Sequence, residues 1–535
     1  MVTELEKQAF VDRVNKLRIN TDAVEKVVVH MPNGDVALGD AKSRTSAGMF
    51  ANATTNDGYI DADAARALLE VYGPAYLAET DRKPSDHKAI FTARVISNLR
   101  LKVRSDVFRR ADSKKMPEHI RVGIDRITRE RGHPTPFYVY DASGIDREIT
   151  RFNDAFSWDK GFVNFFAVKA LPNPNIIEMM ARRNWGADCS SDPELDYASA
   201  AGMVGERMMF TSNDTPDEEF VSARKRGAIL NLDDITHIAA VERATGGLPE
   251  LISFRFNPGS AREGTEIIGQ PEEAKYGLTT EQIHQAYGIA KSKGVKRFVL
   301  HTMIVSNMRD GKYIVETGKM MARLAKELED EHKIKFEFIN IGGGVGIPYR
   351  PEHRGVDLGQ VSAGISMEFR ERWGGKAPSL FMECGRAITG PHGWLISSVR
   401  HVMEKYKTFV GMDACMANLM RPGMYGAYHH ITVLGKENEP LVMTADVVGS
   451  LCEGIDKFAV NRLLPAVQRG DKFAVWEGGA HSHAMCFQYN AKLRCAEFLV
   501  DGNGNPVMIR RAETRRDYAA TLDFPGSKYS DLARE

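Results

Sequence analysis

The chain has 535 residues, and its 71 lysines and arginines equal its 71 aspartates and glutamates, so its formal net charge is zero. The length exceeds what one hydrophobic core usually supports, which predicts more than one domain. A content of 43% apolar and 27% charged residues excludes an intrinsically disordered protein. The charge balance gives no general attraction to nucleic acid or to an anionic membrane, and six cysteines without a C-x-x-C pair argue against a disulfide scaffold and favour a reducing compartment.

No run in the sequence approaches the roughly 18–20 uninterrupted apolar residues that a membrane-spanning helix needs. The first ten residues, MVTELEKQAF, include acidic side chains and lack an apolar core, which is unlike a secretory signal. We therefore expect a cytoplasmic protein whose partners include neither a membrane nor nucleic acid.

The first predicted element is a hairpin in residues 24–40, VEKVVVHMPNGDVALGD. Its two β-rich halves flank Asn33-Gly34, a pair favoured in tight hairpin turns. The remainder of residues 1–135 mixes helical and loop signals. We expect residues 1–135 to form an N-terminal α/β extension that partly contributes to a β domain.

Residues 136–393 alternate short apolar runs with amphipathic segments, of which 173–186, 192–202 and 311–332 have a helical period. The apolar runs are hydrophobic on both faces, as buried parallel strands are. About eight such units predict a (β/α)8 barrel, and a doubly wound sheet is an alternative that periodicity leaves open. The predicted strands are 137–140, 163–168, 207–210, 228–232, 251–256, 297–305, 336–341 and 379–384.

Residues 394–535 follow a different pattern, which predicts a mostly β C-terminal domain. Turn signals such as GKENEP and GNGNP separate the β-rich runs. These runs are 394–412, 429–436, 440–449, 472–479 and 496–511.

Lys169 stands at a predicted strand end, before a loop rich in proline and asparagine, in VNFFAVKALPNPNII. In a β/α barrel this edge of the strands carries the active site. The apolar neighbours of Lys169 partly desolvate its amine, which suits it to a Schiff base. A surface lysine at a strand end is the alternative, and the more common one for such a segment alone.

Two further strand ends carry candidate groups. INIGGGVGIPY (339–349) has three glycines after a strand, where bare backbone N–H groups can approach a phosphate, although tight loops also use such runs. MECGR (382–386) places Glu383 three residues before Arg386, which suits a carboxylate for a pyridinium nitrogen and a guanidinium for an anion. A salt-bridged strand end explains that pair equally well.

The run from about 130 to 515 resembles the pyridoxal-phosphate-dependent basic amino-acid decarboxylases of the alanine-racemase-like barrel fold, of which diaminopimelate decarboxylase is the most similar member. Eight motifs carry the resemblance in the family's order and rough spacing, and together they are far more specific than any one alone. They are PTPFYVYD, FAVKA, EEAKYG, IGGGVGIPY, ECGRAITG, LMRPGMYGAYHHI, GSLCEGIDKFA and FQYNAKLRCAEFLV.

The resemblance implies roles for individual residues. Lys169 would form the Schiff base with pyridoxal phosphate, and Cys452 would return a proton to the carbanion left by the departing CO₂. In this family the cysteine-bearing loop enters the barrel of the partner subunit, which implies a homodimer with shared active sites. The other implied cofactor contacts are Gly342, Gly343, Gly344, Glu383, Arg386, Ser306 and Tyr489, and the implied substrate contacts are Arg386, Arg421, Tyr425, Glu453 and Tyr489.

The sequence departs from the family pattern in LHTMIVSN (300–307). Ser306 keeps a phosphate-contacting position, but Met303 stands where a histidine stacks on the cofactor ring, and Val305 replaces a glycine. His301 would point the same way along the strand as Met303, so it is either a substitute for that histidine or a buried structural residue.

The resemblance implies decarboxylation of meso-diaminopimelate to L-lysine and CO₂. One alternative keeps the fold and cofactor but acts on ornithine, lysine, arginine or a D-amino acid. Another is a pyridoxal-phosphate-binding homologue without catalytic activity, which the departures at Met303 and Val305 motivate. We expect no metal site, since the one strand-end cluster of histidine or aspartate at ligand spacing, His481 and His483, is interpreted as loop or pocket residues.

Overall fold

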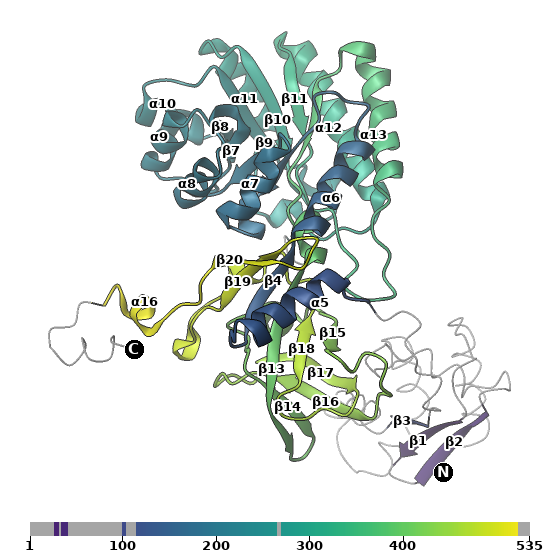
Figure 1. Ribbon diagram of the computed structural model, residues 1–535. Helices are drawn as coiled ribbons and strands as arrows, with labels where there is room; N and C mark the ends of the chain where they lie inside the picture. Colours follow the sequence, from purple (N-terminus) through teal and green to yellow (C-terminus); the bar gives the residue numbers. More distant parts are fainter. Residues whose placement is uncertain (1–25, 32–33, 41–98, 103–113, 265–268, 523–535) are drawn as a thin grey trace, which may run out of the picture.

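A closed barrel of eight parallel strands is the larger unit of the computed structural model (Figure 1). The structure describes residues 26–31, 34–40, 99–102, 114–264 and 269–522. Neighbouring strands pair in parallel around the barrel and β12 closes it against β5, which confirms the predicted (β/α)8 barrel over the doubly wound sheet. The barrel strands are β5 (Val163–Ala167), β6 (Gly186–Cys189), β7 (Met208–Phe210), β8 (Ile229–Leu232), β9 (Leu251–Phe256), β10 (Arg297–Thr302), β11 (Phe336–Asn340) and β12 (Ser379–Met382).

One predicted barrel strand belongs to the second sheet, and one barrel strand was not predicted. Strand β4 (Phe137–Asp141) pairs with β13 and β19, so its assignment to the barrel was wrong. All residues of β4 are buried. A strand that is buried on both faces has a uniformly apolar sequence, whether it belongs to a barrel or to a sheet covered on both faces, so the sequence could not distinguish the two. Strand β6 completes the barrel instead, and its sequence GADC escaped prediction because it lacks β-branched and aromatic residues.

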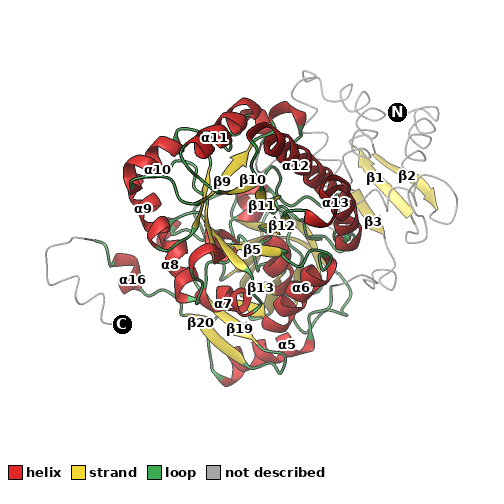
Figure 2. Ribbon diagram, turned by 90° about the horizontal axis from the view of Figure 1, so that it is seen from above, coloured by secondary structure: helices red, strands yellow, loops and turns green. Residues whose placement is uncertain are grey.

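Helices surround the barrel, as the view from above shows (Figure 2). The helix α12 (Gly311–His332) has the predicted bounds and buries Met321, Leu324 and Leu328 against the barrel core. In the described part of the chain, no helix is long and apolar enough to cross a bilayer. The other main helices of this unit are α6 (Ala142–Ala155), α7 (Pro174–Arg182), α8 (Asp192–Ala200), α9 (Asp217–Lys225), α10 (His237–Thr245), α11 (Thr280–Ser292) and α13 (Leu358–Trp373).

A nine-stranded sheet forms the second unit and confirms the mostly β C-terminal region. Its order is β17-β16-β14-β13-β4-β19-β20, with β18 pairing with β13 and β15. A short helix, α15 (Arg421–Tyr425), leads into β15, and α16 (Arg515–Ala519) follows the last strand. Besides β4, the strands are β13 (Gly393–Glu404), β14 (Thr408–Met412), β15 (Ile431–Val433), β16 (Met443–Val448), β17 (Lys457–Leu464), β18 (Lys472–Val475), β19 (Ala496–Val500) and β20 (Pro506–Arg510).

The predicted N-terminal hairpin is confirmed, but the predicted turn position was wrong by one residue, because Gly34 belongs to the second strand. Strands β1 (Lys26–Met31) and β2 (Gly34–Asp40) pair antiparallel with Met31 opposite Gly34, so the connection has two residues. Strand β3 (Leu99–Lys102) pairs with β1 and completes a three-stranded sheet. The rest of the predicted extension up to residue 113 lies outside the described residues.

The residues just before β4 pack on the second sheet. Helix α5 (Glu118–Asp125) buries Ile120 and Ile124 in a cluster that includes Val139 of β4 and Phe498 of β19. Apolar side chains at these positions face the sheet because they lie four residues apart on one side of the helix. Residues 116–127 are therefore part of the core of the β unit.

Candidate active site

A cavity of about 460 Å³ opens at the carboxyl ends of the barrel strands. Its wall combines residues that follow the barrel strands with residues from the second unit, including α15 and the segment after β18. The structure brings seven of the predicted site residues to this wall: Lys169, Ser306, Gly344, Glu383, Arg386, Arg421 and Tyr425.

Lys169 lies in a single 3-10 turn, Val168–Ala170, that directly follows β5. Phe166, Val168 and Ala170 are fully buried, so packing holds the turn in place. The Lys169 side chain is accessible and extends to the cavity wall. The predicted position of this lysine at a barrel strand end is thus confirmed.

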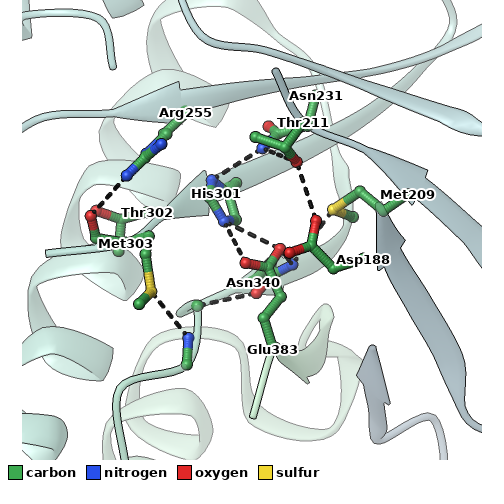
Figure 3. A network of polar contacts seen from close by, with 12 residues as sticks. Asp188, Met209, Thr211, Asn231, Arg255, His301, Thr302, Met303, Asn340 and Glu383 are labelled. Atoms are coloured by element: carbon green, nitrogen blue, oxygen red, sulfur yellow. Dashed lines mark hydrogen bonds and ion pairs between the residues drawn. The ribbon is translucent and has the colours of Figure 1, made fainter. Parts of the chain in front are cut away.

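Glu383 receives hydrogen bonds from two other strands (Figure 3). Asn340 Nδ2 donates to Glu383 Oε1 over 2.8 Å, and His301 Nε2 lies 3.1 Å from Oε2. Burial alone would raise the pKa of Glu383, but the hydrogen bond from His301 and the nearby charges of Lys169 and Arg255 bring it below its ordinary value. The carboxylate is therefore held ionised, and it can accept a hydrogen bond from a protonated ring nitrogen.

Asn231 sets the protonation pattern of His301. The Asn231 Oδ1 accepts from the hydroxyl group of Ser253 over 2.7 Å, which directs the amide nitrogen toward His301 Nδ1, 3.0 Å away. His301 Nδ1 must then accept, and Nε2 carries the proton that is donated to Glu383. The His301 ring is 1% exposed and both of its nitrogens bind protein groups, and it also lines the cavity.

Asp188 is a cavity residue that the sequence did not reveal. Burial and the nearby Glu383 raise its pKa to about 8, with Lys169 opposing the shift, and Thr211 Oγ1 donates to its Oδ1 over 3.3 Å. At neutral pH Asp188 therefore keeps its proton, while Glu383 is an acceptor. The available signal was an aspartate two residues before the helix start SSDPEL, but because strand β6 was not predicted, Asp188 could not be assigned to a barrel strand.

The loop after β11 has a backbone that only glycine adopts readily. Gly342 and Gly344 have φ angles of 71° and 84°, and a Cβ on Gly343 would lie 2.3 Å from a neighbouring carbonyl oxygen. On the cavity wall beside Gly344, Arg386 Nη2 lies 3.5 Å from Ser306 Oγ. A loop without side chains, a hydroxyl group and a guanidinium group together suit a phosphate.

Arg386 and Arg421 share one acceptor, the hydroxyl oxygen of Tyr349, at 2.5 and 2.7 Å. Arg421 also lies 3.0 Å from His429 Nε2, and burial together with Arg421 lowers the pKa of His429 to about 3, so this imidazole is neutral. Within the described ranges neither buried guanidinium forms an ion pair with a carboxylate. Two such charges on one wall favour a ligand with anionic groups.

Lys114 fixes the loop that carries the Tyr349 hydroxyl group. Its Nζ donates to the carbonyl oxygens of Pro348 over 2.6 Å and of Tyr349 over 3.3 Å, and to a carboxyl oxygen of Glu477. Burial raises the pKa of Glu477 from its ordinary value of 4.5 to about 7, with Lys114 opposing the shift. A residue upstream of the barrel therefore supports the arginine wall of the cavity.

We expect Glu477→Gln to gain stability relative to the wild type as the pH rises. The folded protein keeps this proton up to about pH 7, whereas the unfolded chain loses it near the ordinary value of 4.5. The stabilisation from the raised pKa is complete below that ordinary value and is lost as the pH rises through about 7. At roughly 1.4 kcal/mol per pKa unit, this loss amounts to about 3 kcal/mol.

Denaturant unfolding of both proteins across this pH range measures the difference in the free energy of unfolding. Glutamine keeps an acceptor for Lys114, so the variant changes the titration more than the packing. Glu439→Gln, at an exposed glutamate in the loop before β16, is the matched control. A wild-type-to-variant difference that does not change with pH would contradict the prediction.

The two departures from the family pattern lie next to the glycine loop. Met303 lines the cavity, and its Sδ accepts a hydrogen bond from the backbone N–H of Gly343 over 3.2 Å. Val305 is buried, and its carbonyl oxygen lies 2.4 Å from where a Cβ on Gly344 would stand. A thioether at this wall can pack on an aromatic ring but offers no proton to it.

Five predicted residues do not line the cavity of their own chain: Gly342 and Gly343, which precede Gly344 in the glycine loop, and Cys452, Glu453 and Tyr489 of the second unit. Cys452 and Glu453 are exposed in the loop between β16 and β17, and Tyr489 is 48% exposed in the turn Tyr489–Ala491. The two segments touch, since the backbone N–H of Cys452 donates to Asn490 Oδ1 over 2.7 Å. These residues form one surface of the second unit.

His481 does line the cavity, whereas its sequence neighbour His483 does not. The backbone N–H of His481 donates to the carbonyl oxygen of Ala170 over 2.8 Å, which ties it to the turn of Lys169. Burial, reinforced by Arg386 and Lys169, holds the pKa of His481 well below its ordinary value. A neutral imidazole is thus a further polar group of the site.

Comparisons with known proteins agree with this geometry. Residues 142–390 match the family model for the pyridoxal binding domain of pyridoxal-dependent decarboxylases. Protein TabA of Pseudomonas amygdali pv. tabaci is 38% identical over 401 residues, which cover 75% of this chain and 94% of that protein. A diaminopimelate decarboxylase of Methanothermobacter thermautotrophicus is 33% identical over 75% of this chain and 95% of its own length. A solved diaminopimelate decarboxylase of Helicobacter pylori, complexed with L-lysine, superposes with a TM-score of 0.67 at 28% identity over 73% of this chain and 97% of that one.

Proposed function

The chain belongs to the pyridoxal-phosphate-dependent amino-acid decarboxylases, and we propose that its substrate is meso-diaminopimelate, which it converts to L-lysine and CO₂. Relatives named diaminopimelate decarboxylase, 33% and 34% identical over nearly their whole length, support this substrate. The observation that carries it is the arginine wall of Arg386 and Arg421, described above.

Pyridoxal phosphate fits the cavity. Lys169 would hold its aldehyde carbon, Glu383 its ring nitrogen, and the glycine loop with Ser306 and Arg386 its phosphate. A Cβ on Gly343 would collide with the backbone oxygen of Glu383, so this position of the loop accepts only glycine. When bound, the cofactor supplies an electron sink for the bond to the departing carboxyl group.

Three side chains would support this electron sink and the proton transfer that follows. Glu383, ionised and bound by Asn340 and His301, would keep the ring nitrogen protonated and so keep the sink strong. Asp188, which keeps its proton at neutral pH, adds a hydrogen-bond donor close to Lys169 without adding a negative charge. Cys452, whose thiol is exposed, would return a proton to the carbon that loses CO₂.

Substrate choice depends on what faces the distal end of the amino acid. If Arg386 serves the cofactor phosphate, Arg421 remains buried on the wall and lacks a carboxylate partner among the described residues. A buried guanidinium in this state is costly unless a ligand supplies the anion. Diaminopimelate carries a second carboxylate, whereas ornithine, lysine and arginine do not, so the wall favours the diacid.

We also propose that the enzyme works as a homodimer. The exposure of Cys452 and Glu453, away from the cavity of their own chain, supports a loop that enters the cavity of a second copy. In a two-fold dimer each loop would complete the other subunit's site. Glu453 would then lie at the distal end of the substrate and attract its second ammonium group.

The substrate is tested by CO₂ release from meso-diaminopimelate, L-lysine, L-ornithine, L-arginine and D-amino acids. We expect kcat/KM for diaminopimelate to exceed the others by at least about 30-fold, because leaving one partner of a buried charged pair unpaired costs roughly 2–5 kcal/mol, and about 1.4 kcal/mol is a factor of ten. Arg421→Met should remove most of this preference, and Arg421→Lys should keep part of it. Arg400→Met, at an exposed arginine of β13, is the matched control.

Equal turnover of diaminopimelate and a substrate without a distal carboxylate would sink the proposed substrate but not the decarboxylase activity. Met303 supports a second candidate, a decarboxylase for a different amino acid, because it replaces a polar ring at the cofactor with a thioether. The same panel distinguishes the two, since this candidate requires that another member of the panel be the best substrate.

A further inference from the structure

Two imidazoles and one carboxylate meet on the ring of helices outside the barrel, between α11 and α12. His284 comes from α11, and Glu331 and His332 end α12. One ligand atom from each lies within 4.8 Å of the others. None of the three lines the active-site cavity, and His284 is 47 residues away from Glu331, so sequence spacing alone does not reveal the cluster.

The contacts within this cluster leave one donor atom without a partner. Glu331 Oε2 is hydrogen-bonded to His284 Nδ1, while Glu331 Oε1 lies 3.6 Å from His332 Nε2, beyond hydrogen-bonding distance. His332 Nε2 is buried and has no hydrogen-bond partner within the described part of the chain. Lys291 Nζ binds the backbone oxygen of His332 rather than its ring. A buried polar atom in this state is costly and marks a place for a missing ligand.

We propose that His284, Glu331 and His332 bind a divalent transition-metal ion, with zinc as the best match. Two imidazole nitrogens and one carboxylate oxygen are a donor set of zinc, with a fourth position left to water. Magnesium and calcium prefer all-oxygen sites, so this set selects against them. The ion would replace the direct bond between Glu331 and His284 and would give His332 Nε2 its partner.

The position in the fold also favours a cation. Glu331 and His332 lie in the last turn of a 22-residue helix, the end at which the aligned peptide dipoles give a partial negative charge. His284 lies in the neighbouring helix, so the ion cross-links α11 to the end of α12. Binding to the folded chain alone stabilises it by mass action. The ion therefore acts as a clamp on the barrel wall.

The test uses the full-length holoenzyme, freed of metal by dialysis against a chelator. Calorimetric titration with zinc chloride should show about one strong site per chain of this three-ligand type. His284→Ala and Glu331→Gln should each weaken zinc binding by at least about tenfold, the lower limit for losing even an outer-sphere partner. Zinc should raise the melting temperature of the wild type more than that of either variant, and magnesium should raise neither.

His401→Ala, which removes an exposed histidine on β13, is the control and should bind zinc as the wild type does. Both test positions are accessible side chains, and the visible absorbance of the bound cofactor reports that each variant is folded. Decarboxylation is not needed for any of these readouts, so a wrong substrate assignment would leave them unchanged. Zinc affinity that is equal in the wild type and both variants, or absent from the wild type, overturns the site.

Discussion

Lys169→Ala should abolish covalent attachment of pyridoxal phosphate and reduce decarboxylation by at least about 100-fold, and up to about 10⁴-fold, the range for a positioned acid–base group. The side chain is the lysine that follows β5 and reaches the cavity, close enough to Asp188 and Glu383 to lower the pKa of each carboxyl group. Removing it takes away both the amine for the cofactor and a positive charge facing two acids.

Two measurements on the purified protein check this expectation. Wild-type protein incubated with the cofactor should absorb in the visible region, and borohydride reduction should fix the cofactor on the peptide that contains Lys169. Lys169→Arg keeps the positive charge but not the nucleophilic amine, so it should lose the attachment as completely as alanine does. Lys160→Ala, at an exposed lysine just before β5, should behave as the wild type. Label on any other lysine would contradict the assignment.

A heterodimer of one Lys169→Ala chain and one Cys452→Ala chain should recover about half of the wild-type activity, although each parent homodimer is nearly inactive. In a two-fold dimer with exchanged loops, one cavity combines the intact Lys169 of one chain with the intact Cys452 of the other. The second cavity lacks both groups. Cys452→Ala alone should cost roughly 10²–10⁴-fold, as expected for loss of a general acid.

Co-expression of the two variants with different affinity tags, followed by two successive purifications, isolates the heterodimer. The structural reason to expect exchange is that Cys452 and Glu453 are exposed and absent from the cavity wall of their own chain. If the loop instead acted on its own barrel, every cavity in the heterodimer would lack one group. A heterodimer as inactive as its parents, or a monomeric active enzyme, would therefore refute the shared site.

Features of the site that depend only on residues adjacent in the sequence could be predicted from the sequence. Lys169 follows a strongly apolar run, so its place at a strand end could be predicted before its partners were known. The glycine loop at 342–344 and the pair Glu383 and Arg386 could be predicted for the same reason. Each comes just after a barrel strand in the sequence, so the strand itself indicates where these residues lie. The family resemblance rested on these contiguous motifs in order.

Contacts between distant residues could not be predicted in this way. Asp188 lies near Glu383 only because β6 and β12 both flank β5 in the barrel, and β6 has no apolar signal of its own. Strand β4 has the apolar sequence of a barrel strand but pairs with β13 and β19. Lys114 meets Glu477 across 363 residues of sequence.

The sequence by itself therefore determined the fold class, the cofactor chemistry and the strand-end groups, because each follows from short segments and their order. Only the tertiary structure decided which of these groups meet, because the charge on Glu383, the proton on Asp188 and the burial of the Arg421 guanidinium depend on packing and on partners distant in the sequence. The same applies to His284 and His332, whose ligand geometry exists only where two helices pack side by side. Burial and non-local pairing are properties of the packed chain, and they set the chemistry of the site.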